Sequence, residues 1–396
     1  MSSPQAGKCL YLDAKLARML SRSRTISSSL KPILMKTIDS TPKKDGFRMP
    51  GEFELHTQTW MLWPERTDIW PFGAKPAQRN FAEIATAISK FEPVTMGASK
   101  SQYVNARQRL PSNIRVVELS YNGCWIRDTG PTFVVNGEGV VRGVDWSFNA
   151  WGGVEEGLYF PWDQDDLIAY KILDLESIDR YKAPFVLEGG AIHVDGQGTA
   201  LATEECVLNP NRNSPMTKQQ MENLLEDYLN VQKVIWLPKG LYLDETGGHI
   251  DNICCFVRPG VVTLAWTNDK SDPQYDISAE AYEILSASTD VRGGRLEIHK
   301  IEQPNPIYIS QEESDNVDIV EGTVPRTAGS RLPASYINYY FVNGGIVMPL
   351  FEDQNDKKAF EKLTALFPDR KVVSVSTRQI LFGGGNIHCN VQQQPK

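Results

Sequence analysis

The stretch ETGGHIDN, residues 245–252, is one of five small-residue or glycine-rich corners that decide the fold. The other four are WIRDTGP (125–131), LEGGAIHV (187–194), VNGGIVMP (342–349) and FGGGNIHC (382–389). The corners can be marked by Asp128, Glu188, His249, Gly345 and Gly385. These markers lie 60, 61, 96 and 40 residues apart. A mean spacing of about 64 residues, with strand and helix patterns between the corners, indicates a repeat architecture of five units.

Glycine at such corners permits positive φ angles and a close approach of the backbone to a ligand. A single Gly-Gly pair is more simply interpreted as an ordinary turn. Four of the five corners, however, also carry an aspartate, a glutamate, a histidine or a cysteine. We therefore expect the corners to surround one axis and to bring these side chains together.

The segments between the corners alternate between helical and strand patterns. Apolar residues at i, i+3, i+4 and i+7 predict helices at residues 76–91, 214–231, 278–288 and 353–368. Short runs of β-branched and aromatic residues predict strands at residues 57–64, 114–120, 132–136, 140–146, 199–208, 233–238, 252–266, 296–301, 336–350 and 371–376. The alternation predicts an α/β protein in which residues 41–396 form a single catalytic domain.

Composition excludes several classes of protein. The chain has 396 residues, of which 41% are hydrophobic and 23% are charged, as in soluble globular proteins. No apolar run approaches the roughly 18 residues of a membrane span, so we expect no membrane partner. The six cysteines are scattered and include no CxxC pair. This pattern predicts neither a disulfide scaffold nor a zinc site, and we expect no metal or cofactor.

Charge separates a leader from the body of the chain. Residues 1–44 carry a net charge of +7, whereas the whole chain carries −8 and residues 45–396 therefore −15. The acidic body should repel nucleic acid and attract cationic ligands. The basic, Ser/Arg-rich leader at residues 1–40 is interpreted as a mitochondrial or plastid transit peptide, as a disordered tail, or as sequence upstream of a start at Met35. The location is accordingly cytoplasmic or organellar.

The corner at the C-terminus carries a cysteine, Cys389. His388 would face the opposite way on a strand, so His249 is the better partner, and Asp251 shares its face if the corner is extended. A nucleophilic thiolate needs a lowered pKa, but several carboxylates around a thiol would raise it. That arrangement suits a substrate that is itself a cation. A guanidinium group stays charged, and carboxylates can clamp it bidentately beside the sulfur.

The motifs that carry these residues are long and ordered. They are WPER (63–66), CWIRDTGP (124–131), SFNAWGG (147–153), LEGGAIHVDGQGT (187–199), LNPNRN (208–213), DETGGHIDN (244–252), SDPQY (271–275) and GGGNIHC (383–389). From about residue 41 to the end, the chain resembles the agmatine deiminases, which belong to the guanidine-modifying penteins. The resemblance implies a pentein fold, a five-bladed α/β propeller of ββαβ-type units around a pseudo-fivefold axis. It also implies hydrolysis of agmatine to N-carbamoylputrescine and ammonia, a step of putrescine and polyamine biosynthesis.

The resemblance also assigns roles to residues. It implies that Cys389 is the covalent nucleophile and His249 the general acid/base, with Asp128, Glu188 and Asp251 around the guanidinium. Trp125 would form an aromatic wall, and Glu245 and Asp45 would meet the distal amine. Cys124 and Asn390 depart from the family pattern without replacing a catalytic type.

Three alternatives stay open beside this interpretation. A deiminase of free or peptidyl arginine belongs to the same class, although no arginine in the matched motifs is an evident clamp for its carboxylate. A catalytically inactive binding module is the second alternative. The third, a papain-like protease, lacks the local signature around Cys389. We also expect a homo-oligomer, most simply a dimer.

Overall fold

The computed structural model describes residues 34–396. The chain divides into two units, Met1–Met35 and Lys36–Lys396, and only the second is described below. The leader predicted at residues 1–40 falls mostly on residues 1–33, outside the described part, and so does its interpretation as a transit peptide. Backbone hydrogen bonding in the second unit begins slightly before residue 41, the predicted start of the domain. The Ile38 amide donates to the Arg180 carbonyl at 2.7 Å.

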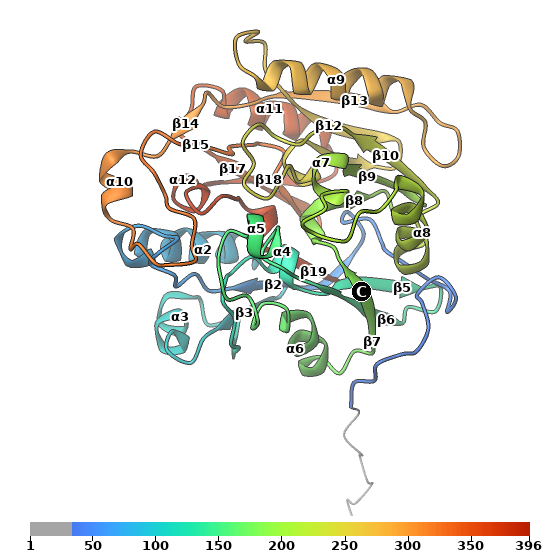
Figure 1. Cartoon of the computed structure of the whole chain (residues 1–396), viewed down its shortest axis with the longest axis horizontal. Helices are drawn as coiled ribbons and strands as arrows, with labels where there is room; N and C mark the ends of the chain where they lie inside the picture. The colour runs from blue at the N-terminus through green and yellow to red at the C-terminus, as the bar shows by residue number, and fades with distance from the viewer. Residues whose placement is uncertain (1–33) are drawn as a thin grey trace, which may run out of the picture. The chain divides into compact units, whose positions relative to one another are not determined.

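Strands of the described residues form six sheets, five of which have three or four strands (Figure 1). The first joins β19 (Gln392–Pro395), β2 (His56–Leu62), β3 (Val94–Ala98) and β4 (Arg115–Glu118). The second joins β1 (Phe47–Arg48), β5 (Thr132–Asn136), β6 (Val141–Ser147) and β7 (Arg180–Val186). The next two are β8 (Ile192–Val194), β9 (Thr199–Thr203) and β10 (Lys233–Leu237), and then β11 (Cys254–Arg258), β12 (Val261–Trp266) and β13 (Glu297–Glu302). The last two are β16 (Tyr340–Val342), β17 (Gly345–Leu350) and β18 (Lys371–Ser376), and the short pair β14 (Ile307–Tyr308) and β15 (Arg331–Leu332).

Helices fill the connections between parallel strands. The longer ones are α2 (Lys75–Ile88), α3 (Tyr103–Arg109), α6 (Ile168–Leu175), α8 (Lys218–Leu229), α9 (Gln274–Ala287) and α11 (Asp356–Leu366). The short ones are η1 (Phe72–Ala74), α4 (Ile126–Thr129), α5 (Gly153–Glu156), η2 (Gly189–Ala191), α7 (Glu204–Val207), η3 (Ile250–Asn252), α10 (Gln311–Asp315), α12 (Arg378–Leu381) and η4 (His388–Asn390). All four helices predicted from periodicity are confirmed.

Each of the five larger sheets contains the same pattern. An antiparallel pair is followed by a helical crossover to a parallel strand, as in β5–β6–β7, β8–β9–β10 and β11–β12–β13. The sheets of β16–β17–β18 and β19–β2–β3 repeat it. Parallel strands need such a long connection, whereas antiparallel ones need only a hairpin. The α/β class predicted from the sequence is therefore confirmed.

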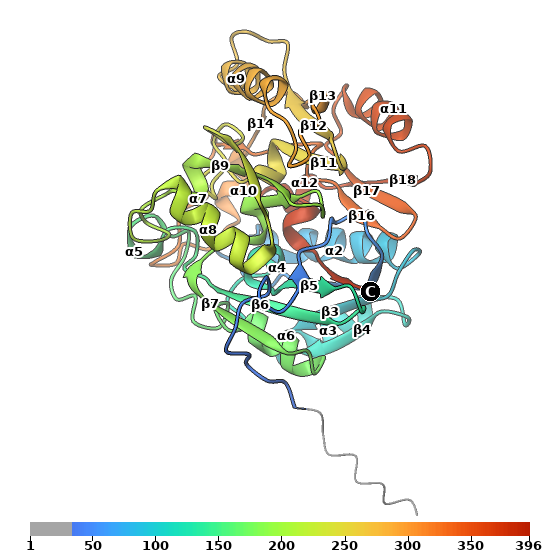
Figure 2. The ribbon, with the colours of Figure 1, turned by 90° about the vertical axis from the view of Figure 1, so that its right-hand side faces the viewer.

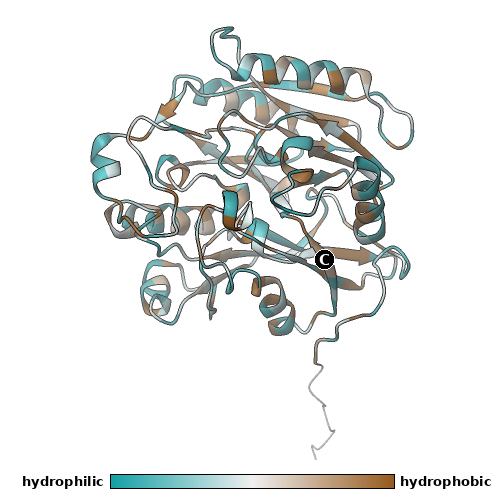
Figure 3. Ribbon diagram, viewed as in Figure 1, coloured by the Kyte–Doolittle hydropathy of each residue, from teal (hydrophilic) through white to brown (hydrophobic). Residues whose placement is uncertain are grey.

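The crossover helices lie on the outside of the strands. Figure 1 and Figure 2 both show α6, α8 and α9 at the periphery of this unit. Figure 3 shows mainly brown strands and helices with teal segments, which matches apolar strands covered by amphipathic helices. Every helix within residues 34–396 is too short or too polar to cross a membrane.

The C-terminal strand is held in the interior by pairing with an N-terminal strand. Gln392, Gln393 and Gln394 of β19 lie opposite Trp60, Thr59 and Gln58 of β2 in antiparallel register. The last few residues of the chain are thereby fixed in a sheet, and η4, which carries Cys389, is fixed just before them. A cysteine so close to a chain end is consequently buried, with 6% of its surface exposed.

Several local expectations were wrong. The predicted strand 199–208 ends at Thr203, whose side chain accepts from the Cys206 amide and caps α7. His249 and Asp251 are not on an extended segment, because Ile250–Asn252 forms the 3-10 helix η3. His388 likewise begins the 3-10 helix η4, so the alternation argument does not apply to it. In both cases the turn is only three residues long, which leaves no periodicity in the sequence.

The marker Gly345 was also misplaced. Gly345 pairs with Val342 at the tight end of the β16–β17 hairpin, away from the position that the other corners occupy. In the other sheets the corner directly precedes the first strand of the antiparallel pair, as η2 precedes β8. The equivalent place before β16 is the turn at Tyr336 and Ile337, followed by Asn338. That corner contains no glycine, which is why the Gly-Gly pattern missed it.

Candidate active site

A pocket lies where these corners meet. Its lining comes from α4, from the loops at residues 151–159 and 323–326, and from the glycine run before η4. The lining residues are Ile69, Trp125, Asp128, Trp151, Leu158, Tyr159, Thr246, Thr323, Arg326, Gly383, Gly384, Gly385 and Cys389. Three of the predicted site residues, Trp125, Asp128 and Cys389, therefore line the same pocket.

The thiol of Cys389 faces polar groups from two other corners. It donates to Oδ2 of Asp251 at 3.6 Å, and Nδ2 of Asn338 donates to Sγ at 3.3 Å. Burial raises the pKa of Cys389 well above its usual value, and the carboxylates of Asp251 and Asp128 raise it further. The contact with Asn338 acts in the opposite direction. A neutral thiol is thus the favoured form until a cation enters.

Glycines let the corners approach one another. A Cβ atom on Gly190 would lie 2.5 Å from Nδ1 of His249, 3.0 Å from Oδ1 of Asp128 and 3.1 Å from Oδ2 of Asp251. A Cβ atom on Gly385 would lie 3.1 Å from Sγ of Cys389 and would also contact the Trp125 ring. Any larger residue at Gly190 or Gly385 would push the polar side chains apart.

His249 is buried between two carboxylates. Its Nδ1 lies 3.9 Å from Oδ1 of Asp128 and its Nε2 lies 4.0 Å from Oε2 of Glu188. Burial lowers the pKa of His249, but Asp128 and the nearby Cys206 outweigh that effect and hold the pKa well above its usual value. Nε2 has no hydrogen-bond partner among residues 34–396. The ring is therefore a buried cation whose Nε2 is free to interact with a ligand.

Asp128 sits in α4 and lines the pocket directly. Its Oδ1 accepts from the Gly190 amide at 2.9 Å and its Oδ2 accepts from Nε1 of Trp151 at 3.0 Å. Burial raises the pKa of Asp128 to about 6; the charge of His249 opposes this, whereas Asp251 and Glu188 add to it. Each carboxylate oxygen keeps a second lone pair that can accept from a ligand.

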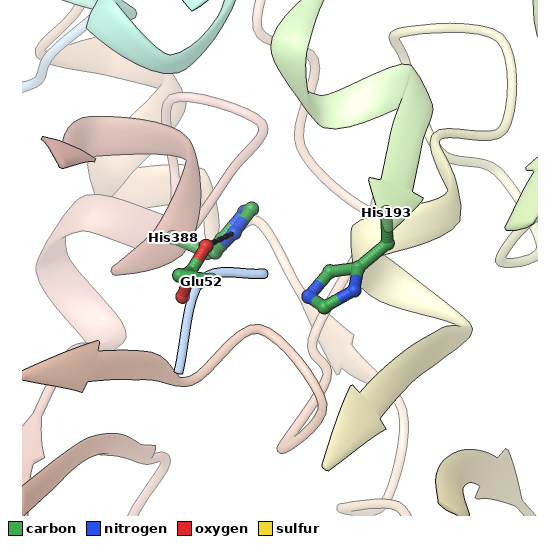
Figure 4. Close-up of side chains that lie close together, drawn as sticks. All are labelled: Glu52, His193 and His388. Atoms are coloured by element: carbon green, nitrogen blue, oxygen red, sulfur yellow. Dashed lines mark hydrogen bonds and ion pairs between the residues drawn. The ribbon is translucent and has the colours of Figure 1, made fainter. Parts of the chain in front are cut away.

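Asp251 is oriented by a buried chain of charges. Its Oδ2 accepts from Nδ1 of His388 at 2.8 Å, and Nε2 of His388 donates to Oε2 of Glu52 at 2.7 Å. Glu52 also contacts Nη2 of Arg127 at 3.2 Å. Figure 4 shows the Glu52 carboxylate against the His388 ring, with the His193 ring pointing toward them.

Both ring nitrogens of His388 face carboxylates, which accept only, so both must donate and the ring carries a positive charge. Burial and Arg127 lower the pKa of His388, but Glu52 and Asp251 outweigh them and raise it. Burial alone would raise the pKa of Asp251, yet the contact with His388 holds it below its usual value. The other oxygen of Asp251, Oδ1, is buried without a partner in the described part of the chain.

Glu188 contacts His249 and is held in a buried ion pair. Its Oε1 accepts from Nε of Arg212 at 3.1 Å, in an ion pair whose two side chains are both buried. Its Oε2 faces Sγ of Cys206 at 3.9 Å. Glu188 is therefore part of the predicted cluster, in contact with His249 and not among the residues that line the pocket.

An aromatic wall closes one side of the pocket. Trp125 packs against Trp70 with ring centroids 5.6 Å apart and meets Trp151 edge to face at 6.4 Å. The ring of Trp125 thus has a fixed orientation beside the sulfur of Cys389, from which it is separated by Gly385. Such a wall can contact the apolar chain of a ligand or stack on a planar cation.

Arg326, which lines the pocket, forms an ion pair with Glu245. Nη1 of Arg326 donates to Oε1 of Glu245, and Nη2 donates to the Gly383 carbonyl at 3.2 Å. The second oxygen of Glu245, Oε2, is buried and unpartnered within residues 34–396, and it lies close to Gly384 of the lining. An acceptor therefore remains available beside the pocket lining.

The structure does not bring Asp45 to the pocket. The carboxylate of Asp45 accepts from Ser40 at 2.8 Å, from Tyr181 at 2.7 Å and from Nη1 of Arg142 at 2.8 Å. All of these partners lie around β1, β6 and β7 and not among the lining residues. The family resemblance implied that Asp45 meets a distal amine, and these contacts do not support that expectation.

Sequence reasoning missed three groups that shape the site. Asn338 and Arg326 lie in loops outside every motif that the sequence analysis singled out. His388 was set aside because an extended backbone was assumed, and the 3-10 turn instead directs its ring to Asp251. Only tertiary contacts reveal these three roles.

Comparison with known proteins agrees with this geometry. A family model for Porphyromonas-type peptidyl-arginine deiminases matches residues 48–395. Agmatine deiminase from Pseudomonas aeruginosa (strain LESB58) is 57% identical over 363 residues, which cover 91% of this chain and 99% of that protein. A structure of agmatine deiminase from Enterococcus faecalis has a TM-score of 0.90 at 48% identity and covers 91% of this chain and 99% of that one.

A more distant structure is a cysteine-to-serine variant of C. jejuni agmatine deiminase with substrate bound, with a TM-score of 0.76 and 26% identity. It covers 88% of this chain and 96% of that one. The resemblance read from the sequence motifs is confirmed, and the chain belongs to the agmatine deiminase family, pentein hydrolases that act on C–N bonds.

Proposed function

We propose that this protein hydrolyses agmatine to N-carbamoylputrescine and ammonia through an amidino-cysteine intermediate on Cys389. The observation that carries the proposal is the position of its sulfur, 3.6 Å from Asp251, whose Oδ1 is buried and unpartnered in residues 34–396. A guanidinium bound to that oxygen would bring its carbon beside the sulfur. Agmatine deiminases among the relatives support agmatine as the substrate.

Binding of the guanidinium prepares the nucleophile. The N–H groups of the substrate would donate to Asp251 and Asp128, which replaces lost hydration by charge-assisted hydrogen bonds. The cation next to Cys389 offsets the two carboxylates that raise the pKa of the thiol. The thiolate is therefore favoured only when the substrate is present, which protects a buried thiol from other reactions.

The chemistry then proceeds in two displacements. The sulfur attacks the guanidino carbon, and protonated His249 gives its proton to the departing nitrogen, which leaves as ammonia. Neutral His249 next removes a proton from water, whose oxygen attacks the amidino carbon. Collapse of that adduct breaks the C–S bond, releases N-carbamoylputrescine and returns the thiolate. These steps require no metal or cofactor.

The distal amine of agmatine would meet Glu245. Its Oε2 offers a buried acceptor, while Arg326 holds the other oxygen and fixes the carboxylate. The four-carbon chain between the two ends would lie along Trp125. This arrangement matches a flexible dication with one charge at each end.

Arg326 favours a second candidate, deimination of free or peptidyl arginine, because a cation in the pocket could accept a carboxylate. Two donor groups of Arg326 are already used by Glu245 and Gly383, and only Nε is unpartnered in the described part of the chain. A bidentate clamp, the geometry that selects carboxylates, is thus not offered. Agmatine remains the better substrate on this ground.

The five-unit propeller is also part of the proposal. The pattern of an antiparallel pair and a parallel strand recurs in five sheets of the described residues and supports five ββαβ-type units. A role in putrescine biosynthesis follows from the product, which retains the putrescine skeleton. The homodimer expected from the sequence stays a prediction.

We predict that Cys389→Ser abolishes turnover and preserves the fold. A serine hydroxyl is far less ionised near neutral pH, and no neighbouring group is arranged to deprotonate it. Intact-mass analysis of rapidly quenched wild-type enzyme should show an amidino adduct on the peptide that contains Cys389. An adduct on Cys124 or Cys206 would refute the assignment.

A second prediction concerns Asp251→Asn. The change is nearly isosteric but adds two donors where the guanidinium needs acceptors. Loss of one partner of a buried charge pair costs about 2–5 kcal/mol, or about two to four decades in kcat/KM. Asp45→Asn is the matched control, because Asp45 lies outside the pocket and should keep wild-type kcat/KM. Equal activities of the two variants on agmatine would exclude Asp251 from the clamp.

Glu245→Gln should act differently from Asp251→Asn. The amide keeps the shape of the side chain but removes its charge, so KM for agmatine should rise much more than kcat falls. Arg326 would then lack its ionic partner, and the preference for agmatine over arginine should decrease. Steady-state assays on both substrates give the measurement, and an unchanged preference would contradict this role.

The pH dependence provides a further prediction. The pKa of Asp128 stands at about 6 in the free protein, and only the ionised form attracts the guanidinium. We therefore expect kcat/KM to fall as pH decreases through about 6, because kcat/KM reports the free enzyme. The acid limb of kcat should lie at lower pH, since a bound cation favours the ionised carboxylate. A kcat/KM that is flat between pH 7 and 5 would contradict the role of Asp128.

A further inference from the structure

Three buried side chains outside the pocket lining are of types that can bind a metal ion. Oε2 of Glu188, Sγ of Cys206 and Nε2 of His249 all lie within 4.8 Å of one another, and all three residues are buried. Sγ is 3.9 Å and Nε2 4.0 Å from the glutamate oxygen. The sequence predicted no metal site because it contains no CxxC pair, but these ligands come from three separate segments.

The three atoms could bind a metal ion once His249 gives up its Nε2 proton. Nε2 of His249 is buried and has no hydrogen-bond partner within residues 34–396. Arg212 occupies only Oε1 of Glu188 and leaves Oε2 facing the other two atoms. The Cys206 thiol is fixed at the start of α7, where its amide donates to the cap Thr203 at 3.4 Å.

A second cluster of metal-ligand types offers a useful contrast. Glu52, His193 and His388 also lie close together, as Figure 4 shows. There, however, both nitrogens of His388 donate to carboxylates, and Arg127 neutralises Glu52. No lone pair of His388 remains for a metal, and two cations adjoin the site. The cluster around Cys206 also contains an ion pair, Arg212 with Glu188, but there Nε2 of His249 has no hydrogen-bond partner within residues 34–396.

We propose that Glu188, Cys206 and His249 bind Zn²⁺ and that the bound ion inhibits the enzyme by occupying His249. Binding of the ion does not depend on the proposed function, whereas the inhibition rests on it. One thiolate, one imidazole and one carboxylate are ligand types that Zn²⁺ accepts, with water as a fourth ligand. Coordination would release two protons to solvent, one from the Cys206 thiol and one from Nε2 of His249.

The geometry requires only small movements. Tetrahedral Zn²⁺ with bonds of about 2.0–2.3 Å places its ligand atoms roughly 3.4–3.7 Å apart, slightly closer than they lie now. The surroundings already hold the ligands as structural zinc sites do, because Arg212 orients Glu188 and Asp128 faces the other ring nitrogen of His249.

Cobalt titration tests the binding directly, because Co²⁺ replaces Zn²⁺ and a thiolate ligand gives a near-ultraviolet charge-transfer band. The band should appear in the wild type and in Cys389→Ser, and it should be absent in Cys206→Ala. Cys254→Ala is the matched control, a buried cysteine without a carboxylate partner, and should keep the band. Absence of the band in the wild type, or its loss in Cys389→Ser, would overturn the site.

Activity measurements test the inhibition. Zn²⁺ should inhibit agmatine hydrolysis reversibly, with recovery on addition of a chelator. Inhibition is measured relative to the metal-free rate of each variant, and Cys206→Ala should require at least about tenfold more Zn²⁺ for half-inhibition. Equal sensitivity of Cys206→Ala and wild type would refute the inhibitory site. If Cys206→Ala does not fold, Glu188→Gln replaces it in the cobalt titration, and an unchanged Co²⁺ affinity would overturn the proposal.

If the protein does not hydrolyse agmatine, the cobalt titration still decides whether the site exists. Failure of the proposed function and failure of the metal site are therefore distinguishable. Persistence of the Co²⁺ band together with inactivity would reject the function alone, and loss of the band together with normal activity would reject the site alone.

Discussion

Burial of several carboxylates within a few ångströms of one another is the constraint on which the rest of this structure depends. Moving an ion from water into a protein interior costs several kcal/mol unless a partner compensates. Glu52 contacts Arg127 and His388, and Glu188 contacts Arg212. Asp251 forms an ion pair with the protonated ring of His388. Most of the acidic centre is thereby neutralised by the protein itself, with cations drawn from distant parts of the chain.

Asp128 differs from the other carboxylates of the centre. Its nearest cation among the described residues is His249, at 3.9 Å, and its pKa is raised to about 6. The buried oxygen Oδ1 of Asp251 likewise lacks a partner in residues 34–396. The uncompensated part of the acidic centre is therefore confined to the place beside Cys389, where a guanidinium would supply the missing charge.

The same constraint explains the glycine corners. Charged side chains can gather around one ligand only if the backbone segments that carry them approach closely. Gly190 leaves room for His249, Asp128 and Asp251. This gathering of side chains could be predicted from the sequence, since small residues stand beside an aspartate, a glutamate, a histidine or a cysteine in four motifs. The role of Asn338 could not be predicted, because the turn before it contains no glycine. His388 could not either, because a three-residue 3-10 turn has no periodic signature and reverses the direction that alternation predicts.

The strands and long helices could be predicted because burial of one face imposes a regular spacing of apolar residues over at least five positions. The charge chain through Arg127 and Glu52 could not, since its members lie 75 positions apart and lack any motif. A site whose buried carboxylates need a cation cannot select its ligand by charge alone. Unpaired carboxylate oxygens attract a metal ion as well as a guanidinium. The aromatic wall and the distal Glu245 therefore have to provide the discrimination, through length and shape.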